Sequence, residues 1–165
     1  MERLWAPWRL EYVKDAAERK EEVCVFCGAV SADMAEEDSL VVHRGPHTIT
    51  MLNKYPYNNG HLMVAPLRHL AELSALSPEE SHEIFRLITH SVKILKKVFN
   101  PDGFNIGINL GRSAGAGIVG HLHWHVVPRW NGDTNFMPVL ADVKVIPEHL
   151  SQTLSTLRPH FEKIE

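Results

Sequence analysis

The stretch "HLHWHVVP", from His121 to Pro128, alternates histidines with apolar residues over most of its length. A period of two is typical of a β-strand, because successive side chains of a strand point to opposite faces of a sheet. The pattern predicts a strand whose apolar residues enter a core. Its three histidines, His121, His123 and His125, then share the other face.

The histidine row has three possible explanations. At a rise of ~3.3 Å per residue, His121 and His125 are roughly 13 Å apart, too far to bind one ion through bonds of ~2 Å. Three histidines on a merely solvated face are also disfavoured, because Ser, Thr or Lys would serve equally well there. A reactive site is the remaining explanation. Neutral imidazole, with a pKa of ~6.5, can act as a nucleophile or as a donor near pH 7.

A glycine-rich segment, "NLGRSAGAGIVG" over 109–120, directly precedes the row. Such a loop can present backbone N–H groups to phosphate oxygens, although by itself it is equally well a flexible connection. It lacks the lysine pattern of a P-loop, which argues against an ATPase. Arg112 and Arg129 flank the region, either to neutralise phosphate charge or as exposed arginines without that role. Together, loop and row suggest phosphoryl chemistry bordered by His123.

The rest of the chain predicts an α+β domain around a mainly antiparallel sheet. Short strands are expected in "SLVVHRG", "TITMLNKYPYNNG", "HLMVAPLRH" and "FNIGINL". Residues 78–99 have helical periodicity, with Ser77 and Glu80 as a capping box and Pro78 in the first helical position. Asn100 to Gly103 should end that helix. A final helix is expected to open at Pro147.

Composition limits the class of protein. The chain has 165 residues, 44% of them hydrophobic, which favours a single domain. Charges throughout the N-terminal arm, residues 1–20, argue against a signal peptide or membrane span, so a cytoplasmic protein without membrane contact is expected. A net charge of -3 without a Lys/Arg run argues against nucleic acid as the partner.

Cys24 and Cys27 are the only cysteines of the chain and form the motif "CVFC". A Cys-x-x-Cys pair in an intracellular protein is a redox pair, half of a zinc site or a coincidence. From the residues alone these alternatives stay open.

Four segments carry a resemblance to a known family. "HLHWHVV" resembles the His-φ-His-φ-His-φ-φ signature of the histidine-triad superfamily, and "NGHLMVAPLRH" resembles that family's upstream strand. "LWAPWR" and "HVVPRWNGDTNF" resemble its bacterial diadenosine tetraphosphate phosphorylase branch. The resemblance implies a single domain over 1–165, with about five antiparallel strands, one long helix and a C-terminal helix over 147–165. It also implies a homodimer with a sheet continuous across two protomers.

The resemblance further implies an enzyme that cleaves dinucleoside polyphosphates in two steps, with diadenosine tetraphosphate as the expected substrate. His123 would attack the α-phosphorus and form a nucleotidyl-imidazole, which water or inorganic phosphate then releases. His125 would stabilise phosphate oxygens or the leaving group, and His61 would support the site from the neighbouring strand.

Six residues match nucleotide-binding positions of the family. Asn53 would bind ribose and Met51 would lie near the base, while the others belong to the phosphate loop and its approach: Asn109, Ser113, Gly115 and Gly117. Gly117 stands where related hydrolases carry a glutamine, which favours phosphate over water as the acceptor. The help that the glutamine gives to the leaving group is then either absent or supplied by Ser113 or backbone amides. A hydrolase of dinucleoside polyphosphates or nucleoside phosphoramidates, and a nucleotide-binding signalling module, remain alternatives.

Several members of the family carry a structural zinc, which offers an explanation for the cysteine pair. The matching ligands in this sequence are Cys24, Cys27, His69 and His121. On that interpretation His121 is structural, and only His123 and His125 take part in the chemistry.

Overall fold

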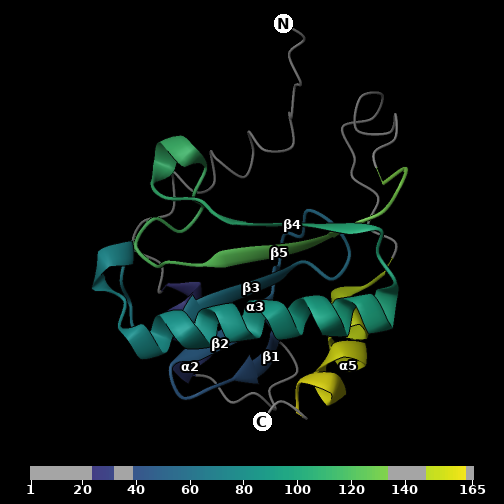
Figure 1. The fold of residues 1–165 in the computed structure, drawn as a ribbon, viewed down its shortest axis with the longest axis horizontal. Helices are drawn as coiled ribbons and strands as arrows, with labels where there is room; N and C mark the ends of the chain where they lie inside the picture. The colour runs from purple at the N-terminus through teal and green to yellow at the C-terminus, as the bar shows by residue number, and fades with distance from the viewer. Residues whose placement is uncertain (1–23, 32–38, 134–147, 163–165) are drawn as a thin grey trace, which may run out of the picture.

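The computed structural model describes residues 24–31, 39–133 and 148–162, so the N-terminal arm predicted over 1–20 lies outside the described residues. Five strands form one antiparallel sheet, and the predicted α+β fold is confirmed (Figure 1). The strands are β1 (Val41–Arg44), β2 (Thr48–Leu52), β3 (Leu62–Pro66), β4 (Gly103–Ile108) and β5 (Trp124–Arg129).

The spatial order of the strands, β1-β2-β3-β5-β4, brings distant parts of the chain together. β3 pairs with β5 and sets Met63 opposite His125. As a result, His61 and His125 become neighbours although 64 positions separate them in the sequence.

The predicted strand at His121–Pro128 begins three residues later than expected, at Trp124. Continuing the register of β3 and β5 would pair Leu122 with Pro66, which has no N–H to donate. The N–H of Leu122 instead donates to the backbone oxygen of Leu70 at 2.8 Å. The first two histidines of the row therefore precede the strand.

The long helix α3 (Pro78–Phe99) begins and ends where the sequence predicts. The Ser77 hydroxyl accepts the Glu80 N–H at 3.2 Å, and the Glu80 carboxylate accepts the Ser77 N–H at 2.8 Å. Glu80 also accepts two bonds from the Arg68 guanidinium, at 2.7 and 2.6 Å. Asn100, in the left-handed conformation with φ 46°, ends the helix.

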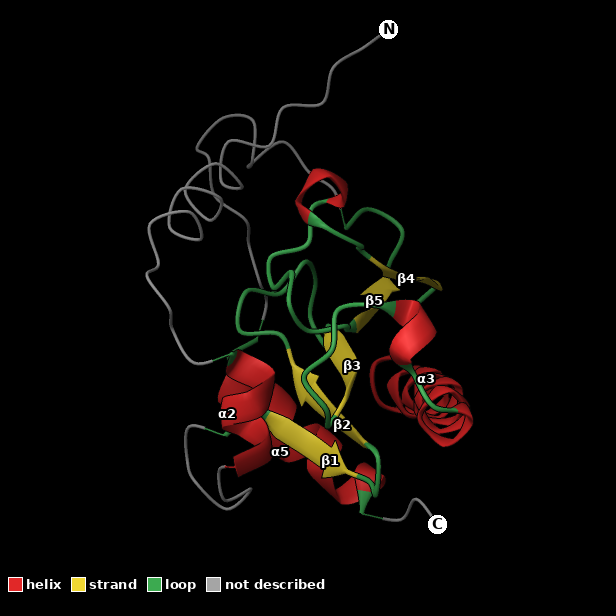
Figure 2. Cartoon of the chain, turned by 90° about the vertical axis from the view of Figure 1, so that its left-hand side faces the viewer, coloured by secondary structure: helices red, strands yellow, loops and turns green. Residues whose placement is uncertain are grey.

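Helices lie on both faces of the sheet (Figure 2). On one face, α3 and α5 (Leu150–Phe161) cover the larger apolar cluster, which includes Leu87, Trp124 and Val126. On the other face, α2 (Val25–Ser31) covers a smaller cluster that includes Phe26. Because side chains alternate along β5, Trp124 and Val126 face α3 while His125 faces the α2 side.

The C-terminal helix was predicted over 147–165, but α5 begins at Leu150 and ends at Phe161. His149 has an extended backbone, and the Glu148 carboxylate accepts a bond from Thr153 at 2.6 Å, which keeps residues 148 and 149 outside the helix. Pro147 lies outside the described residues.

Two short 3-10 helices, η1 (Leu73–Ala75) and η2 (Arg112–Ala114), lie in the connections that lead to α3 and β5. Among the helices of the described ranges, none is long and apolar enough to cross a membrane.

Candidate active site and metal centre

His61 and His125 form a hydrogen-bonded pair on the α2 side of the sheet. His61 is fully buried, and its Nε2 lies 3.0 Å from Nδ1 of His125. The backbone N–H of Tyr57 donates to His61 Nδ1 at 3.0 Å, so that nitrogen carries the lone pair. The proton of neutral His61 is therefore on Nε2 and is donated to His125. A neutral His125 then carries its own proton on Nε2, as a hydrogen-bond donor.

His123 has the opposite tautomer. Its side chain is buried, with 4% exposure, and Nδ1 lies 2.8 Å from the backbone oxygen of His121. A carbonyl oxygen only accepts, so Nδ1 carries the proton and Nε2 carries the lone pair. Burial lowers the pKa of His123, and the bond to the His121 carbonyl raises it in part. The neutral form of the ring is therefore favoured, with the lone pair on Nε2.

The rings of His123 and His125 lie next to each other, with centroids 4.9 Å apart and planes nearly perpendicular. A nucleophilic nitrogen and an N–H donor on adjacent rings are what transfer of a phosphoryl group to nitrogen requires. In such a reaction one group would attack phosphorus, and the other would donate to an oxygen on which charge accumulates.

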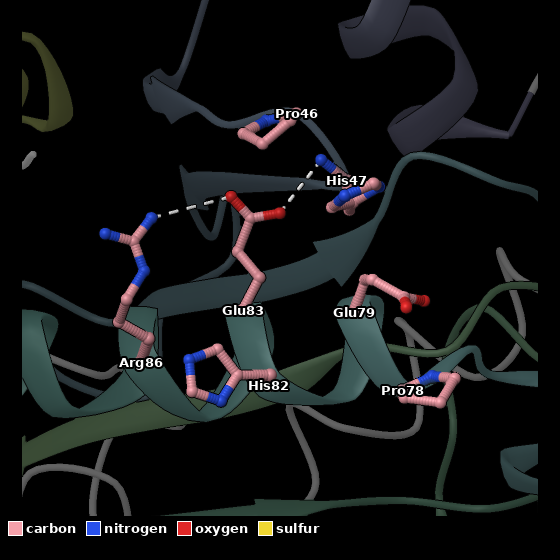
Figure 3. Close-up of a pocket in the computed structure, with 7 residues that line it drawn as sticks. All are labelled: Pro46, His47, Pro78, Glu79, His82, Glu83 and Arg86. Carbon is pink, nitrogen blue, oxygen red and sulfur yellow. Dashed lines mark hydrogen bonds and ion pairs between the residues drawn. The ribbon is translucent and has the colours of Figure 1, made fainter.

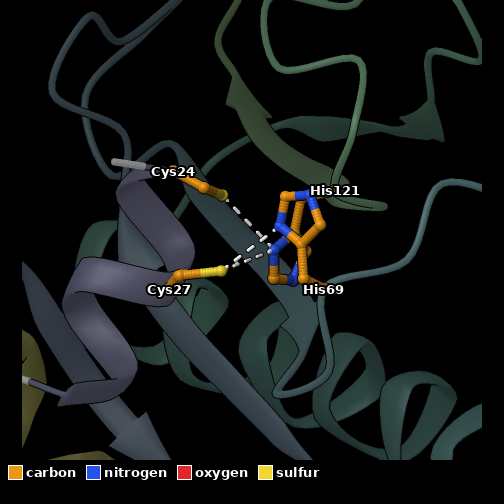
Figure 4. A group of neighbouring side chains, drawn as sticks. All are labelled: Cys24, Cys27, His69 and His121. Carbon is orange, nitrogen blue, oxygen red and sulfur yellow. Dashed lines mark hydrogen bonds between the residues drawn. The ribbon is translucent and has the colours of Figure 1, made fainter. Parts of the chain in front are cut away.

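Four predicted metal ligands come together in one cluster (Figure 4). The ligand atoms of Cys24, Cys27, His69 and His121 all lie within 4.8 Å of one another. The Cys24 sulfur lies 3.4 Å from Nδ1 of His121, and the Cys27 sulfur lies 3.2 Å from Nδ1 of His69. Residues from the start of α2 and the position before it, from the segment after β3 and from the segment before β5 thus form one cluster.

The cluster fits a tetrahedral metal ion. With metal–sulfur bonds of ~2.3 Å and metal–nitrogen bonds of ~2.0 Å, neighbouring S and N ligands should be about 3.6 Å apart. The observed S–N distances run from 3.2 to 3.7 Å. His121 Nε2 donates to the Pro66 carbonyl at 2.8 Å, which turns Nδ1 toward the sulfurs, as the supporting bond of a metal-bound histidine does.

The protonation of the two thiols would also change with a bound cation. Burial, together with the neighbouring Cys24, raises the pKa of the Cys27 thiol. A divalent cation between the two sulfurs would reverse that effect by stabilising both thiolates.

Gly120 leaves room for one ligand of the cluster. A Cβ at position 120 would lie 3.1 Å from Nε2 of His69. A side chain at position 120 would therefore press on His69.

The predicted nucleotide-binding residues fall into three environments. The Asn53 amide nitrogen lies 3.4 Å from His61 Nδ1, and its oxygen accepts the Tyr55 N–H at 2.9 Å. Met51 is buried in the cluster that α2 covers, with 5% exposure. The other four lie in the connection between β4 and β5. Asn109 and Gly115 are half-buried there, and Ser113 and Gly117 are exposed.

Arg129 has partners within the protein. Its guanidinium donates to both carboxylate oxygens of Asp133, at 2.6 and 2.8 Å, and to the Asn105 side chain at 2.7 Å. Asp133 compensates the charge of Arg129, whereas Arg112 is exposed.

A surface pocket lies where the turn between β1 and β2 meets the first turns of α3 (Figure 3). At its centre the Glu83 carboxylate accepts the His47 N–H at 2.8 Å and lies 3.7 Å from the Arg86 guanidinium. The bond from the His47 N–H holds the turn on the helix. The pocket contains none of the predicted site residues; it is lined by Pro46, His47, Pro78, Glu79, His82, Glu83 and Arg86.

Sequence reasoning missed three groups that complete the site. Two are backbone groups, the N–H of Tyr57 and the carbonyl of Pro66, and no sequence pattern reveals backbone partners. The third is Phe26, whose ring lies 5.0 Å from that of His121 and 5.2 Å from that of His123. The sequence did indicate that Phe26 would lie near the site, because Phe26 stands between Cys24 and Cys27.

Comparisons with known proteins match this chain to one family and to enzymes of that family. Residues 34–132 match the family model of the HIT domain. The chain is 41% identical over 167 residues to AP-4-A phosphorylase of Mycobacterium tuberculosis, covering 99% of this chain and 86% of that protein. It is 34% identical over 95 residues to the asymmetrical bis(5'-nucleosyl)-tetraphosphatase of Schizosaccharomyces pombe, covering 58% and 52%.

Among solved structures, the chain is similar to a Zn-bound histidine triad family protein from Mycobacterium smegmatis. The TM-score is 0.66 at 27% identity, and the match covers 85% of this chain and 94% of that one.

Proposed function

This chain belongs to the HIT domain family and is an enzyme of that family, and we propose that it cleaves dinucleoside polyphosphates at an α-phosphorus through a nucleotide bound covalently to His123. The proposed substrate is diadenosine tetraphosphate, and the proposed acceptor is inorganic phosphate. The tautomer of His123 is the observation that carries the proposal, because the His121 carbonyl holds the proton on Nδ1 and leaves Nε2 as the nucleophile.

In the first step, the lone pair of His123 Nε2 forms a bond to the α-phosphorus as the bond from that phosphorus to its bridging oxygen breaks. The leaving group is ATP. His125 would donate from Nε2 to a phosphate oxygen or to the leaving oxygen, and His61 keeps that proton in place through the 3.0 Å bond.

In the second step, an oxygen of inorganic phosphate attacks the α-phosphorus, the bond to Nε2 breaks and ADP is released. Water in place of phosphate would release AMP. The relatives' names cover both outcomes, a phosphorylase and a tetraphosphatase. The 41% identity over nearly the whole chain and the glycine at position 117 support phosphate.

The decisive experiment follows diadenosine tetraphosphate turnover with and without phosphate, with His123→Asn as the control. We expect ADP and ATP, at a rate that rises with phosphate. AMP and ATP at a rate independent of phosphate would make the enzyme a hydrolase.

A second measurement tests the covalent step. Denaturing the protein in mid-reaction with α-labelled substrate should leave label on His123. Nucleotide binding without label and without turnover would instead assign a signalling module.

For the metal cluster we propose a structural zinc. Two sulfur and two nitrogen ligands at tetrahedral spacing support zinc, and a Zn-bound protein is among the similar structures. Zinc would tie α2 to β3 and β5. Elemental analysis should find one zinc per chain, and Cys24→Ser should lower both zinc content and melting temperature. Protein purified without chelator that contains no zinc would contradict this.

We further propose a homodimer through the edge of β4. Among the described strands, β4 ends the sheet on one side, with Ile106 49% exposed and Leu110 46% exposed nearby. The opposite edge, β1, packs against α5. Light scattering should give a dimer mass for the native chain and a monomer mass for Ile106→Lys. A monomer at micromolar concentration for the native chain would exclude the interface.

A further inference from the structure

We propose that Phe26 is a positioning residue that couples the metal cluster to His123. The inference rests on the proposed function in one respect: His123 is taken as the attacking residue. What Phe26 contacts is independent of that assumption.

Phe26 lies between the two cysteines on α2 and is completely buried. Its ring centroid lies 5.0 Å from that of His121, a member of the cluster, and 5.2 Å from that of His123. The two contacts have similar tilts, 46° and 37°. One apolar ring thus touches both a metal ligand and the proposed nucleophile.

The position of α2 depends on tertiary contacts. The helix has only 7 residues, well short of the ~12 at which an isolated helix approaches stability. On one side Cys24 and Cys27 join the cluster, and on the other the Arg44 guanidinium donates to the Ala29 carbonyl at 2.6 Å. Loss of the metal would remove the first of these restraints, and Phe26 would move with the helix.

The second restraint on His123 comes from the same cluster. The His123 Nδ1–H bond ends on the carbonyl of His121, and the His121 side chain is held by the cluster and by Pro66. The metal ligands therefore reach His123 by two routes, through the His121 backbone and through the Phe26 ring. With both in place, the ring of His123 has one tautomer and one orientation.

The test compares Phe26→Ala and Phe26→Leu with Leu87→Ala, a truncation in the larger apolar cluster on the α3 side of the sheet. Each variant is characterised by zinc content, by kcat and KM, and by the ¹⁵N NMR signals of His123, assigned with His123→Asn. These signals report which ring nitrogen carries the proton, and they need no substrate.

We expect zinc-loaded Phe26→Ala to show a mixture of His123 tautomers. Its kcat should be lower by about 10- to 100-fold with KM unchanged, because a displacement of a reacting group by about 1 Å can reduce the rate by that factor. Phe26→Leu, which keeps most of the volume, should fall between Phe26→Ala and the native chain. Leu87→Ala should match the native chain in tautomer and kcat. Native protein stripped of zinc should show the same mixture as Phe26→Ala.

Two results would overturn the coupling. One is a single Nδ1–H tautomer in zinc-loaded Phe26→Ala with native kcat. The other is an unchanged tautomer after zinc removal. If the native chain has no turnover, the proposed function fails, but the NMR comparison still decides whether Phe26 positions His123.

Discussion

The α3 side and the α2 side of the sheet are built from alternating residues of the same strands, yet they differ in content. The α3 side holds a large apolar cluster covered by a helix of 22 residues. The α2 side has a smaller cluster, a helix of 7 residues, and the histidines at 61, 123 and 125 with the candidate metal ligands. One face of the sheet can therefore hold polar side chains under a short helix, because the opposite face supplies most of the apolar burial.

The largest effect should come from the α2 side and should alter turnover rather than folding. We expect His123→Asn to reduce kcat/KM by about 10⁴-fold or more, equivalent to ~5.5 kcal/mol of barrier, because it removes the nucleophile. Rates with diadenosine tetraphosphate measure this. The unfolding free energy, measured with urea, should change far less, and a rate within tenfold of native would remove His123 from the mechanism.

The second effect, on the α3 side, should lower stability and leave turnover unchanged. Leu87 is fully buried against the larger cluster, so Leu87→Ala should lower the unfolding free energy by about 3 kcal/mol through a lost side chain and a cavity. Urea denaturation measures the loss. The kcat of the folded protein should stay native, and a fall in kcat would mean that the two faces are not separable.

The third effect concerns the support of the proposed donor. We expect His61→Gln to lower kcat by about 10²-fold, since His125 loses the ring that fixes its tautomer. His47→Gln is the matched control, because the side chain of His47 lies in the pocket beside α3 and outside the site. Equal rates for both variants would show that the bond between His61 and His125 has no catalytic role.

The smallest effect is a dependence of stability on pH at the start of α3. The Arg68 guanidinium holds the pKa of the Glu80 carboxyl below its usual range. The stabilisation is therefore complete above the pKa of an unfolded Glu, ~4.3, and is lost as the pH falls through the lower folded value.

Urea denaturation at several pH values measures this dependence, with Glu80→Gln as the reference. The native chain should lose stability below pH ~4.3 more steeply than the variant. Parallel curves for the two proteins would show that the pairing with Arg68 does not contribute.

Local sequence signals predicted the elements well and their ends less well. Ser77, Pro78 and Glu80 gave the start of α3 because a capping box needs only neighbouring residues. The start of β5 at Trp124 was missed, because it depends on Pro66, a residue of the partner strand. The start of α5 at Leu150 depends on a bond that the Thr153 hydroxyl donates to the Glu148 carboxylate, which no local pattern reveals.

The candidate site shows the same division. Spacing in the sequence marked the histidine row, and resemblance to a family supplied His61 and the four metal ligands. Only the fold brought His61 to His125 and Cys24 to His121, because these contacts join residues 64 and 97 positions apart.

By itself, then, the sequence determined which side chains of the last strand face the core, since alternation along a strand is a local property. The tertiary structure decided the tautomers. The Tyr57 N–H and the His121 carbonyl, each fixed by the packing of the chain, place the lone pair on Nδ1 in His61 and on Nε2 in His123. Two identical side chains acquire different roles because the backbone presents a donor to one and an acceptor to the other.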